Sequence, residues 1–197
     1  PEWVYSITDV AHFNQALINA LGLDQYILMG SSMGGWIASE MASMSSDNLR
    51  ALILVDAAGI KPEEGEIAEI FMVSAATRMQ QRFYDTSQVE NYEALTRELS
   101  NEEKLVDHSN KEMASRLCWK PYLHNLSLPY YLAAVTTPTL IVWGKQDAII
   151  PVECADLFSK AISNSQIKII DKCGHSPAIE KPEEFLNIVG NFLQSIN

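Results

Sequence analysis

The sequence lacks any long uninterrupted hydrophobic run. Nowhere in its 197 residues do about 18 apolar residues follow one another. The N-terminus also has no basic segment followed by an apolar run and a small-residue cleavage site. These absences predict a soluble chain without a signal peptide, a membrane-spanning helix or a membrane partner.

Positive charge is scarce as well. The 14 Lys and Arg residues stand against 25 Asp and Glu residues, which gives a net charge of −11. No stretch gathers basic side chains into a patch that could neutralise phosphates, so we expect no nucleic-acid partner. What is present in quantity is hydrophobic sequence, at 47% of residues, enough for one domain with a substantial core.

Cysteine is rare and unpatterned. Cys118, Cys154 and Cys173 are odd in number and lack the close pairing of metal sites and CxxC redox motifs. We therefore expect free thiols in a reducing compartment, which indicates a cytoplasmic location. The pattern offers no metal site.

Short apolar runs alternate with helical patterns along both ends of the chain. Strands are predicted at residues 26–29, 51–55, 139–143 and 167–170, and the last three runs suit strands buried on both faces. Helices are predicted at residues 6–21, around Trp36 to Met41, at 152–162 and at 183–196. In the first helix the apolar face is expected to be formed by Val10, Phe13, Leu17 and Leu21, after a capped start at Ser6 and Asp9 and before a stop at Gly22. This alternation predicts an α/β fold with a mostly parallel sheet of about four strands flanked by helices.

The middle of the chain has a different pattern. Its polar, helix-like sequence predicts a helical insertion, with apolar residues at helical spacing at Ile67, Ile70, Phe71, Ala75 and Met79. Pro121, Pro129 and Pro138 break its C-terminal part. We predict a core of residues 1–60 and 136–197 and a helical cap of residues 61–135.

A G-x-S-x-G motif lies where the second helix follows the strand at 26–29. Gly30, Ser32 and Gly34 satisfy it, and a serine on such a strand-to-helix turn has its hydroxyl raised above the sheet. Positions two before and two after the serine are expected to be crowded, which favours Ser32 over Ser31 because a frame centred on Ser31 puts methionines there. The backbone amide of Met33 is expected to hold a developing oxyanion.

A serine nucleophile needs a base and an orienting acid. Asp147 and His175 each follow a predicted strand, and in an open α/β sheet such positions converge on one crevice. The chain order Ser, Asp, His is the one expected for this fold. Asp56, which follows the strand at 51–55, is an alternative orienting acid.

These segments resemble the α/β-hydrolase superfamily, through GSSMGGWIASE, IVWGKQDAIIP and KCGHSPAIEKPEEFLNIVGNFL. The likeness is greatest to bacterial esterases and to hydrolases that cleave carbon-carbon bonds in meta-cleavage products. It implies that Ser32 forms an acyl-enzyme, that His175 passes its proton to the leaving group, and that Asp147 steadies the imidazolium. It also implies a cap over the acyl pocket, with Phe71, Met72 and Trp119 as candidate substrate contacts. The mechanism requires no metal or organic cofactor.

The chain departs from that family at its start. The family begins with further strands and a His-Gly loop that supplies a second oxyanion amide, and the sequence contains neither. We therefore expect an unpaired sheet edge at residues 26–29, open to a homodimer or a segment swap. Loss of one oxyanion donor costs about 100 to 1,000-fold in turnover, so a weakly active fragment is one alternative.

Three functions follow for this sequence. The first is hydrolysis of a small, largely apolar ester or related carbonyl substrate. Carbon-carbon bond hydrolysis would use the same three residues, although Ser176 stands where those enzymes often carry an aromatic after the histidine. The third is a hydrolase-fold binding protein with little or no catalysis. Epoxide and haloalkane hydrolases use a carboxylate nucleophile, which Ser32 excludes.

Overall fold

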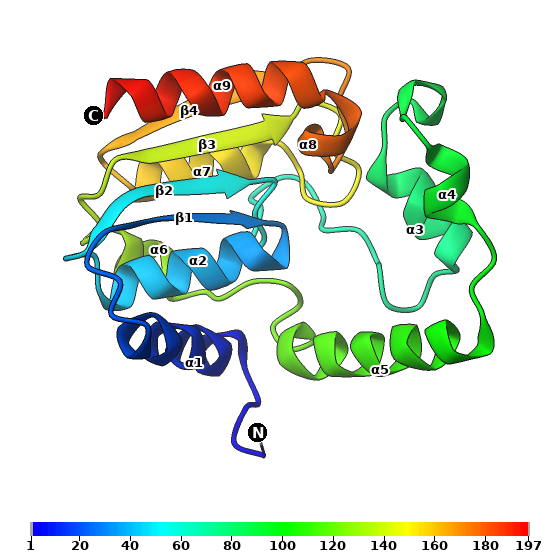
Figure 1. The fold of residues 1–197 in the computed structure, drawn as a ribbon, viewed down its shortest axis with the longest axis horizontal. Helices are drawn as coiled ribbons and strands as arrows, with labels where there is room; N and C mark the ends of the chain where they lie inside the picture. Colours follow the sequence, from blue (N-terminus) through cyan, green and yellow to red (C-terminus); the bar gives the residue numbers. More distant parts are fainter. Residues whose placement is uncertain (1, 197) are drawn as a thin grey trace.

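The computed structural model, which describes residues 2–196, contains one parallel β-sheet (Figure 1). Its strands pair in the order β1-β2-β3-β4, and each neighbouring pair is parallel. The strands are β1 (Tyr26–Ser31), β2 (Leu49–Val55), β3 (Thr139–Gly144) and β4 (Ser165–Ile170). The predicted α/β class and the four predicted strands are therefore confirmed.

The central strands are buried on both faces. Every residue of β3 is buried, as is every residue of β2 except Arg50. Because successive strand side chains point to opposite faces, Leu52 and Leu54 join one hydrophobic cluster while Ile53 and Val55 join the other. Full burial of such a side chain stabilises the fold by about 1.5 to 3 kcal/mol.

Helices cover both faces of the sheet. The first cluster includes residues of α1 (Ile7–Ala20), α2 (Met33–Met44) and α7 (Glu153–Ala161), and the second includes Phe185 and Phe192 of α9 (Pro182–Ser195). In Figure 1, α9 lies along one side of the sheet, and α1 and α2 lie along the other. The predicted helices at these positions are confirmed.

Helix α1 begins as predicted but buries a different face. The Ser6 hydroxyl accepts a hydrogen bond from the Asp9 backbone amide at 3.1 Å, and Gly22 follows the helix at φ +64°. The buried residues of this helix are Ile7 and Ala11. Phe13, Leu17 and Leu21 are 46%, 49% and 62% exposed, so they do not form the packed face that their spacing predicts.

The prediction of a helix through Ile67, Ile70 and Phe71 is wrong. The structure has no helix in residues 61–74, and the first helix of the region is α3 (Ala75–Arg82). Backbone groups in this stretch bond to distant partners instead, such as the Ala68 amide, which donates to the Ile149 carbonyl at 2.9 Å. Ile67, Ile70 and Phe71 still pack against the main hydrophobic cluster.

Four further helical elements complete this region. They are η1 (Thr86–Gln88), α4 (Tyr92–Thr96), α5 (Asn101–Cys118) and α6 (Leu128–Leu132). Helices α3 and α4 lie beyond the ends of the sheet to which the strand arrows point in Figure 1. Leu128 and Leu132 of α6 are fully buried in the main cluster, so this end of the predicted cap packs on the sheet layer. No helix among residues 2–196 combines the length and the apolar character needed to cross a membrane.

The outer strands are only partly covered. On β1, Ile27 and Met29 are 42% and 55% exposed, and on β4 Ile169 is 42% exposed. The prediction of two-sided burial therefore fails for β4, because it lies at one edge of the sheet. Strand β1 lies at the other edge, and pairing of that edge with a second copy stays a prediction.

The three cysteines are free, as expected, and all three are buried. Burial raises the pKa of the Cys118 thiol to about 11 and that of the Cys154 thiol to about 12. The cytoplasmic location stays a prediction.

Candidate active site

Ser32 occupies a strained turn between β1 and α2. Its backbone has φ 54° and ψ −123°, a conformation that costs a residue other than glycine about 1 to 3 kcal/mol. Neighbouring backbone groups hold it there: the Ser32 amide donates to Val55 at 2.9 Å, and its carbonyl accepts from Ala58 at 3.0 Å. Such strain is typical of functional sites, where the surrounding structure determines the conformation.

Two glycines, Gly30 and Gly35, permit this turn, and only Gly30 is one of the two that were predicted. A side chain on Gly30 would overlap the carbonyl group of Gly34. On Gly35, a Cβ atom would lie 2.5 Å from the Cβ atom of Ala57. A Cβ atom on Gly34 would meet nothing within 4 Å, so the expected crowding at that position is absent among the described residues. The close approach is made by the Gly34 backbone instead.

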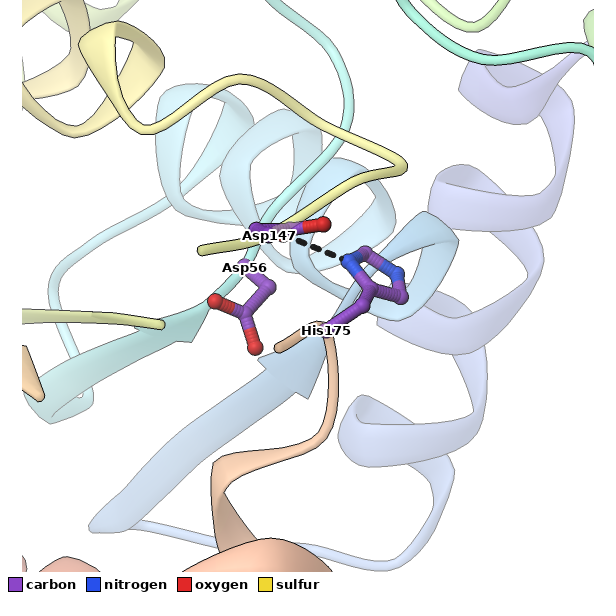
Figure 2. Close-up of side chains that lie close together, drawn as sticks. All are labelled: Asp56, Asp147 and His175. Carbon is purple, nitrogen blue, oxygen red and sulfur yellow. Dashed lines mark hydrogen bonds and ion pairs between the residues drawn. The ribbon is translucent and has the colours of Figure 1, made fainter. Parts of the chain in front are cut away.

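Asp147 and His175 lie in hydrogen-bond contact (Figure 2). Asp147 Oδ2 is 2.7 Å from His175 Nδ1, and its Oδ1 accepts from the amides of Ile149 at 2.8 Å and Ile150 at 3.1 Å. The Asp147 side chain is fully buried and that of His175 is 8% exposed. Because an ionised carboxylate can only accept, Nδ1 of His175 donates, which leaves Nε2 able to take a proton.

The loop that carries His175 is held by the end of α3. The Arg82 carbonyl accepts from the His175 amide at 2.8 Å, and Arg82 Nε donates to the Ser176 hydroxyl at 2.7 Å. A Cβ atom on Gly174 would lie 2.7 Å from the Arg82 carbonyl oxygen and from the Tyr84 nitrogen. Gly174 therefore allows a close approach of two chain segments more than 80 residues apart.

Glu180 joins the same two segments. Its buried carboxylate accepts from the Gly174 amide at 2.6 Å and from the Asp85 amide at 2.8 Å. Glu180 and Arg82 were not predicted from the sequence, because neither lies in a recognisable motif. Their role depends on which distant backbone groups the fold brings beside the histidine.

Ser32 and His175 line one cavity of about 770 Å³. Met33 follows Ser32 as the first residue of α2, and the first backbone amides of a helix have no acceptor within the helix. Residues from α3 to α5 form much of the remaining wall: Ala75, Ala76, Arg78, Met79, Gln80, Arg82, Tyr92, Leu95, Thr96 and Asp107. The cavity is of the size typical of small-molecule sites.

The three predicted substrate contacts lie outside that wall. Phe71 and Trp119 pack with Tyr122 in an aromatic cluster, with ring centroids 5.7 to 6.0 Å apart. Met72 is 79% exposed. Ile70, the neighbour of Phe71, lines the cavity instead.

Asp56 is a third titratable group beside Asp147 and His175. It follows β2 with φ 44°, is fully buried, and accepts from the Gly144 amide at 2.8 Å. Figure 2 shows it beside Asp147 and His175, and one ligand atom of each of the three lies within 4.8 Å of the others. Burial first, and then the charge of Asp147, raise the pKa of the Asp56 carboxyl well above its ordinary value. The cluster has ligand types that could hold a metal ion, although His175 Nδ1 is already bonded to Asp147.

Comparison with known proteins places the chain among hydrolases. The family model of serine aminopeptidase S33 matches residues 1–182. Monoacylglycerol lipase ABHD6 of Mus musculus is 28% identical over 185 residues, covering 86% of this chain and 55% of that protein. A 2-hydroxy-6-oxo-6-(2'-aminophenyl)hexa-2,4-dienoic acid hydrolase of Metapseudomonas resinovorans is 28% identical over 188 residues, covering 89% and 62%. The chain thus spans little more than half the length of these relatives.

A solved structure agrees with them. The serine hydrolase CarC, which is involved in carbazole degradation, superposes with a TM-score of 0.75 at 25% identity. The match covers 98% of this chain and 73% of CarC. The arrangement of strands and helices is therefore that of α/β hydrolases.

Proposed function

Because the chain belongs to the serine aminopeptidase S33 family of α/β hydrolases, we propose that it hydrolyses a small ester or related carbonyl substrate through an acyl-enzyme. The proposed nucleophile is Ser32, the general base is His175, and the orienting acid is Asp147. These roles are assigned from the chain's own geometry. The relatives are longer than the region that matches, so their activities are not carried over to this chain.

One observation carries the proposal. His175 donates to Asp147 over 2.7 Å and lines the same cavity as Ser32, whose backbone is held in a strained turn. A buried carboxylate fixes the imidazole tautomer, which leaves Nε2 as the proton acceptor. Asp147 therefore has stronger support as the orienting acid than Asp56, whose contact within the site is to Gly144.

The proposed reaction has two halves. In the first, Ser32 Oγ attacks the substrate carbonyl while His175 Nε2 takes the serine proton, and the same proton then passes to the leaving alcohol. In the second, His175 takes a proton from water, the hydroxide adds to the acyl carbon, and the carboxylic acid leaves as Ser32 regains its proton. Asp147 stabilises the imidazolium in both halves.

The developing oxyanion has a donor at the start of α2. The Met33 amide lies at the positive end of the helix dipole, next to Ser32. A hydrogen bond there stabilises the tetrahedral intermediate more than the planar substrate, which is the condition for rate acceleration.

The cavity wall indicates what the substrate is like. Ile70, Met79, Leu95 and Leu99 offer apolar surface, which suits the acyl part of a largely apolar substrate. Arg82 adds a cation beside the histidine.

Carbon-carbon bond hydrolysis is the second candidate function. The Metapseudomonas resinovorans relative is named for a dienoic acid substrate, and a carboxylate of that kind would pair with a guanidinium. Arg82 lines the cavity, and its Nε contacts the neutral hydroxyl of Ser176. Ser176 in place of an aromatic residue argues the other way, so ester hydrolysis remains the first candidate.

Labelling with a fluorophosphonate probe tests the nucleophile. The probe phosphorylates an activated serine, and peptide mapping then locates the modified residue. We expect modification on Ser32, loss of labelling in Ser32→Ala, and retained labelling in Ser31→Ala, the matched change of the exposed neighbouring serine. Modification of the Ser32→Ala variant at an undiminished rate would refute the assignment.

A substrate panel then separates the two reactions. Nitrophenyl esters with acyl chains of two to eight carbons, and a meta-cleavage dienoate, would be compared on the same preparation. Faster turnover of the esters supports the first candidate, and faster turnover of the dienoate supports the second.

A further inference from the structure

Asp56 is a buried carboxyl group for which the proposed mechanism has no use. Its side chain is fully buried, and Oδ1 accepts from the Gly144 amide at 2.8 Å. Its Oδ2 is buried and has no hydrogen-bond partner among residues 2–196. An unsatisfied buried carboxylate oxygen is costly, whereas a protonated carboxyl group carries no net charge to desolvate.

The neighbouring carboxyl group differs in its partners. Asp147 accepts three hydrogen bonds, from the amides of Ile149 and Ile150 and from the imidazole of His175. These donors satisfy an ionised carboxylate. An oxygen atom of Asp56 lies within 4.8 Å of one of Asp147, so ionisation of both would place two negative charges together in a buried site.

We propose that Asp56 is a positioning residue that holds the proton of this carboxyl pair, while Asp147 holds its single negative charge. When Asp147 is neutralised, Asp56 ionises and replaces that charge. Asp56 would thereby limit the negative charge beside His175 to one. The location of the proton does not depend on the proposed function, whereas the effect on Ser32 reactivity rests on it.

Burial and the two neighbouring carboxylates act on Asp56 in the same direction. Glu180 and Asp147 both raise the pKa of the Asp56 carboxyl by their negative charge, and burial contributes more than either. The Gly144 amide opposes them. Cys173 is buried on the neighbouring loop, and His175 lies within 4.8 Å. Removal of the Asp147 charge therefore removes the larger of the two repulsions and favours release of the Asp56 proton to solvent.

The backbone allows an isosteric test. Asp56 has a positive φ of 44°, which asparagine tolerates as well as aspartate does. Asp56→Asn keeps the oxygen that accepts from Gly144 and removes the titratable proton. Asp171→Asn is the matched control, since Asp171 lies on the His175 loop, is 61% exposed and pairs with Lys145.

Infrared difference spectroscopy at pH 7 reads the proton directly. The wild type is expected to show the C=O stretching band of a protonated carboxylic acid, which Asp56→Asn lacks and Asp171→Asn retains. In Asp147→Asn the band is expected to disappear as Asp56 ionises. A wild-type spectrum equal to that of Asp56→Asn, or a band that persists in Asp147→Asn, overturns the proposal. The 13C resonance of the Asp56 carboxyl in unsubstituted protein gives the same answer if a variant fails to fold.

The second measurement is the rate of fluorophosphonate labelling. Asp147→Asn is expected to label at least about tenfold faster than Asp147→Asn/Asp56→Asn, because an opposite charge within 4 to 6 Å of an imidazolium stabilises it by about that factor or more. The advantage is expected to fade at acidic pH as Asp56 takes up its proton. Equal rates in the single and double variants overturn the replacement role. Absence of labelling in the wild type counts against the proposed function alone, and the infrared result still decides where the proton resides.

Discussion

The backbone amide of His175 donates a hydrogen bond of 2.8 Å to the carbonyl oxygen of Arg82. Arg82 is the last residue of α3, and α3 supplies a large part of the cavity wall. The imidazole and the wall that faces a substrate are therefore mechanically linked. A shift of α3 on ligand binding would be transmitted to the loop that positions the base.

Glu180→Ala tests this link. The substitution leaves the amides of Gly174 and Asp85 without their acceptor, so we expect a loss of about 1 to 3 kcal/mol in the free energy of unfolding. We also expect labelling of Ser32 to slow by about tenfold or more, since small displacements of a base are costly. Urea unfolding and labelling kinetics measure the two effects. Glu184→Ala, on the exposed first turn of α9, is the control, and equal behaviour of the two variants would contradict the link.

Gly174→Ala is expected to destabilise the fold through steric overlap. Its Cβ atom would lie 2.7 Å from the Arg82 carbonyl oxygen at the end of α3 and from the Tyr84 nitrogen just after it, and these atoms cannot move without breaking the contacts of Arg82. We expect a loss of about 1 to 3 kcal/mol. In Gly190→Ala in α9 the new Cβ atom meets no atom of the described part of the chain within 4 Å, leaving aside its chain neighbours and the nearby backbone of the helix itself. This change is expected to stabilise by about 0.5 to 1 kcal/mol, because alanine is the better helix former. The idea fails if urea melts show the same sign for both changes.

The stability difference between Asp56→Asn and the wild type should depend on pH. The raised pKa of Asp56 means that, above the ordinary carboxyl pKa of about 3.9, the unfolded chain loses this proton while the folded chain keeps it. Folding then takes up a proton, so this group lowers stability as pH rises, by at most about 1.4 kcal/mol per pH unit. Asparagine has no such proton. We expect the variant to gain relative stability from pH 4 upward, and parallel stability curves between pH 4 and 8 would contradict this.

Ser32→Gly is expected to be more stable than Ser32→Ala. Both lack the hydroxyl group, but only glycine adopts φ 54° with ψ −123° without strain, which favours it by about 1 kcal/mol. Ser39 in the middle of α2 is the control, where the order should reverse because glycine weakens a helix. A more stable alanine variant at both positions would show that the turn carries no strain.

Much of the fold could be predicted because its signals are local. The runs that became β2 and β3 are apolar along their whole length, as a strand buried on both faces requires. The capped start of α1 needs only Ser6 and Asp9, three residues apart. The turn at Ser32 was predictable for the same reason, since its glycines lie within a few residues of the serine.

Other features depended on partners that no local pattern specifies. The periodicity of Ile67, Ile70 and Phe71 predicted a helix, but the Ala68 amide bonds to the Ile149 carbonyl across the fold. In α1, spacing identified an apolar face, while packing against α2 buried Ile7 and Ala11 instead. Tertiary contacts outweigh propensity in such segments.

By itself, the sequence determined the alternation of strands and helices, the turn at Ser32, and the candidate roles of Asp147 and His175 at strand ends. Only the tertiary structure decided that Asp147 rather than Asp56 bonds the imidazole, that Glu180 and Arg82 hold the histidine loop, and which side chains line the cavity. The physical reason is the range of the interactions: caps and strained turns involve neighbours in the chain, whereas burial, charge repulsion and hydrogen bonds between loops exist only once distant segments have met.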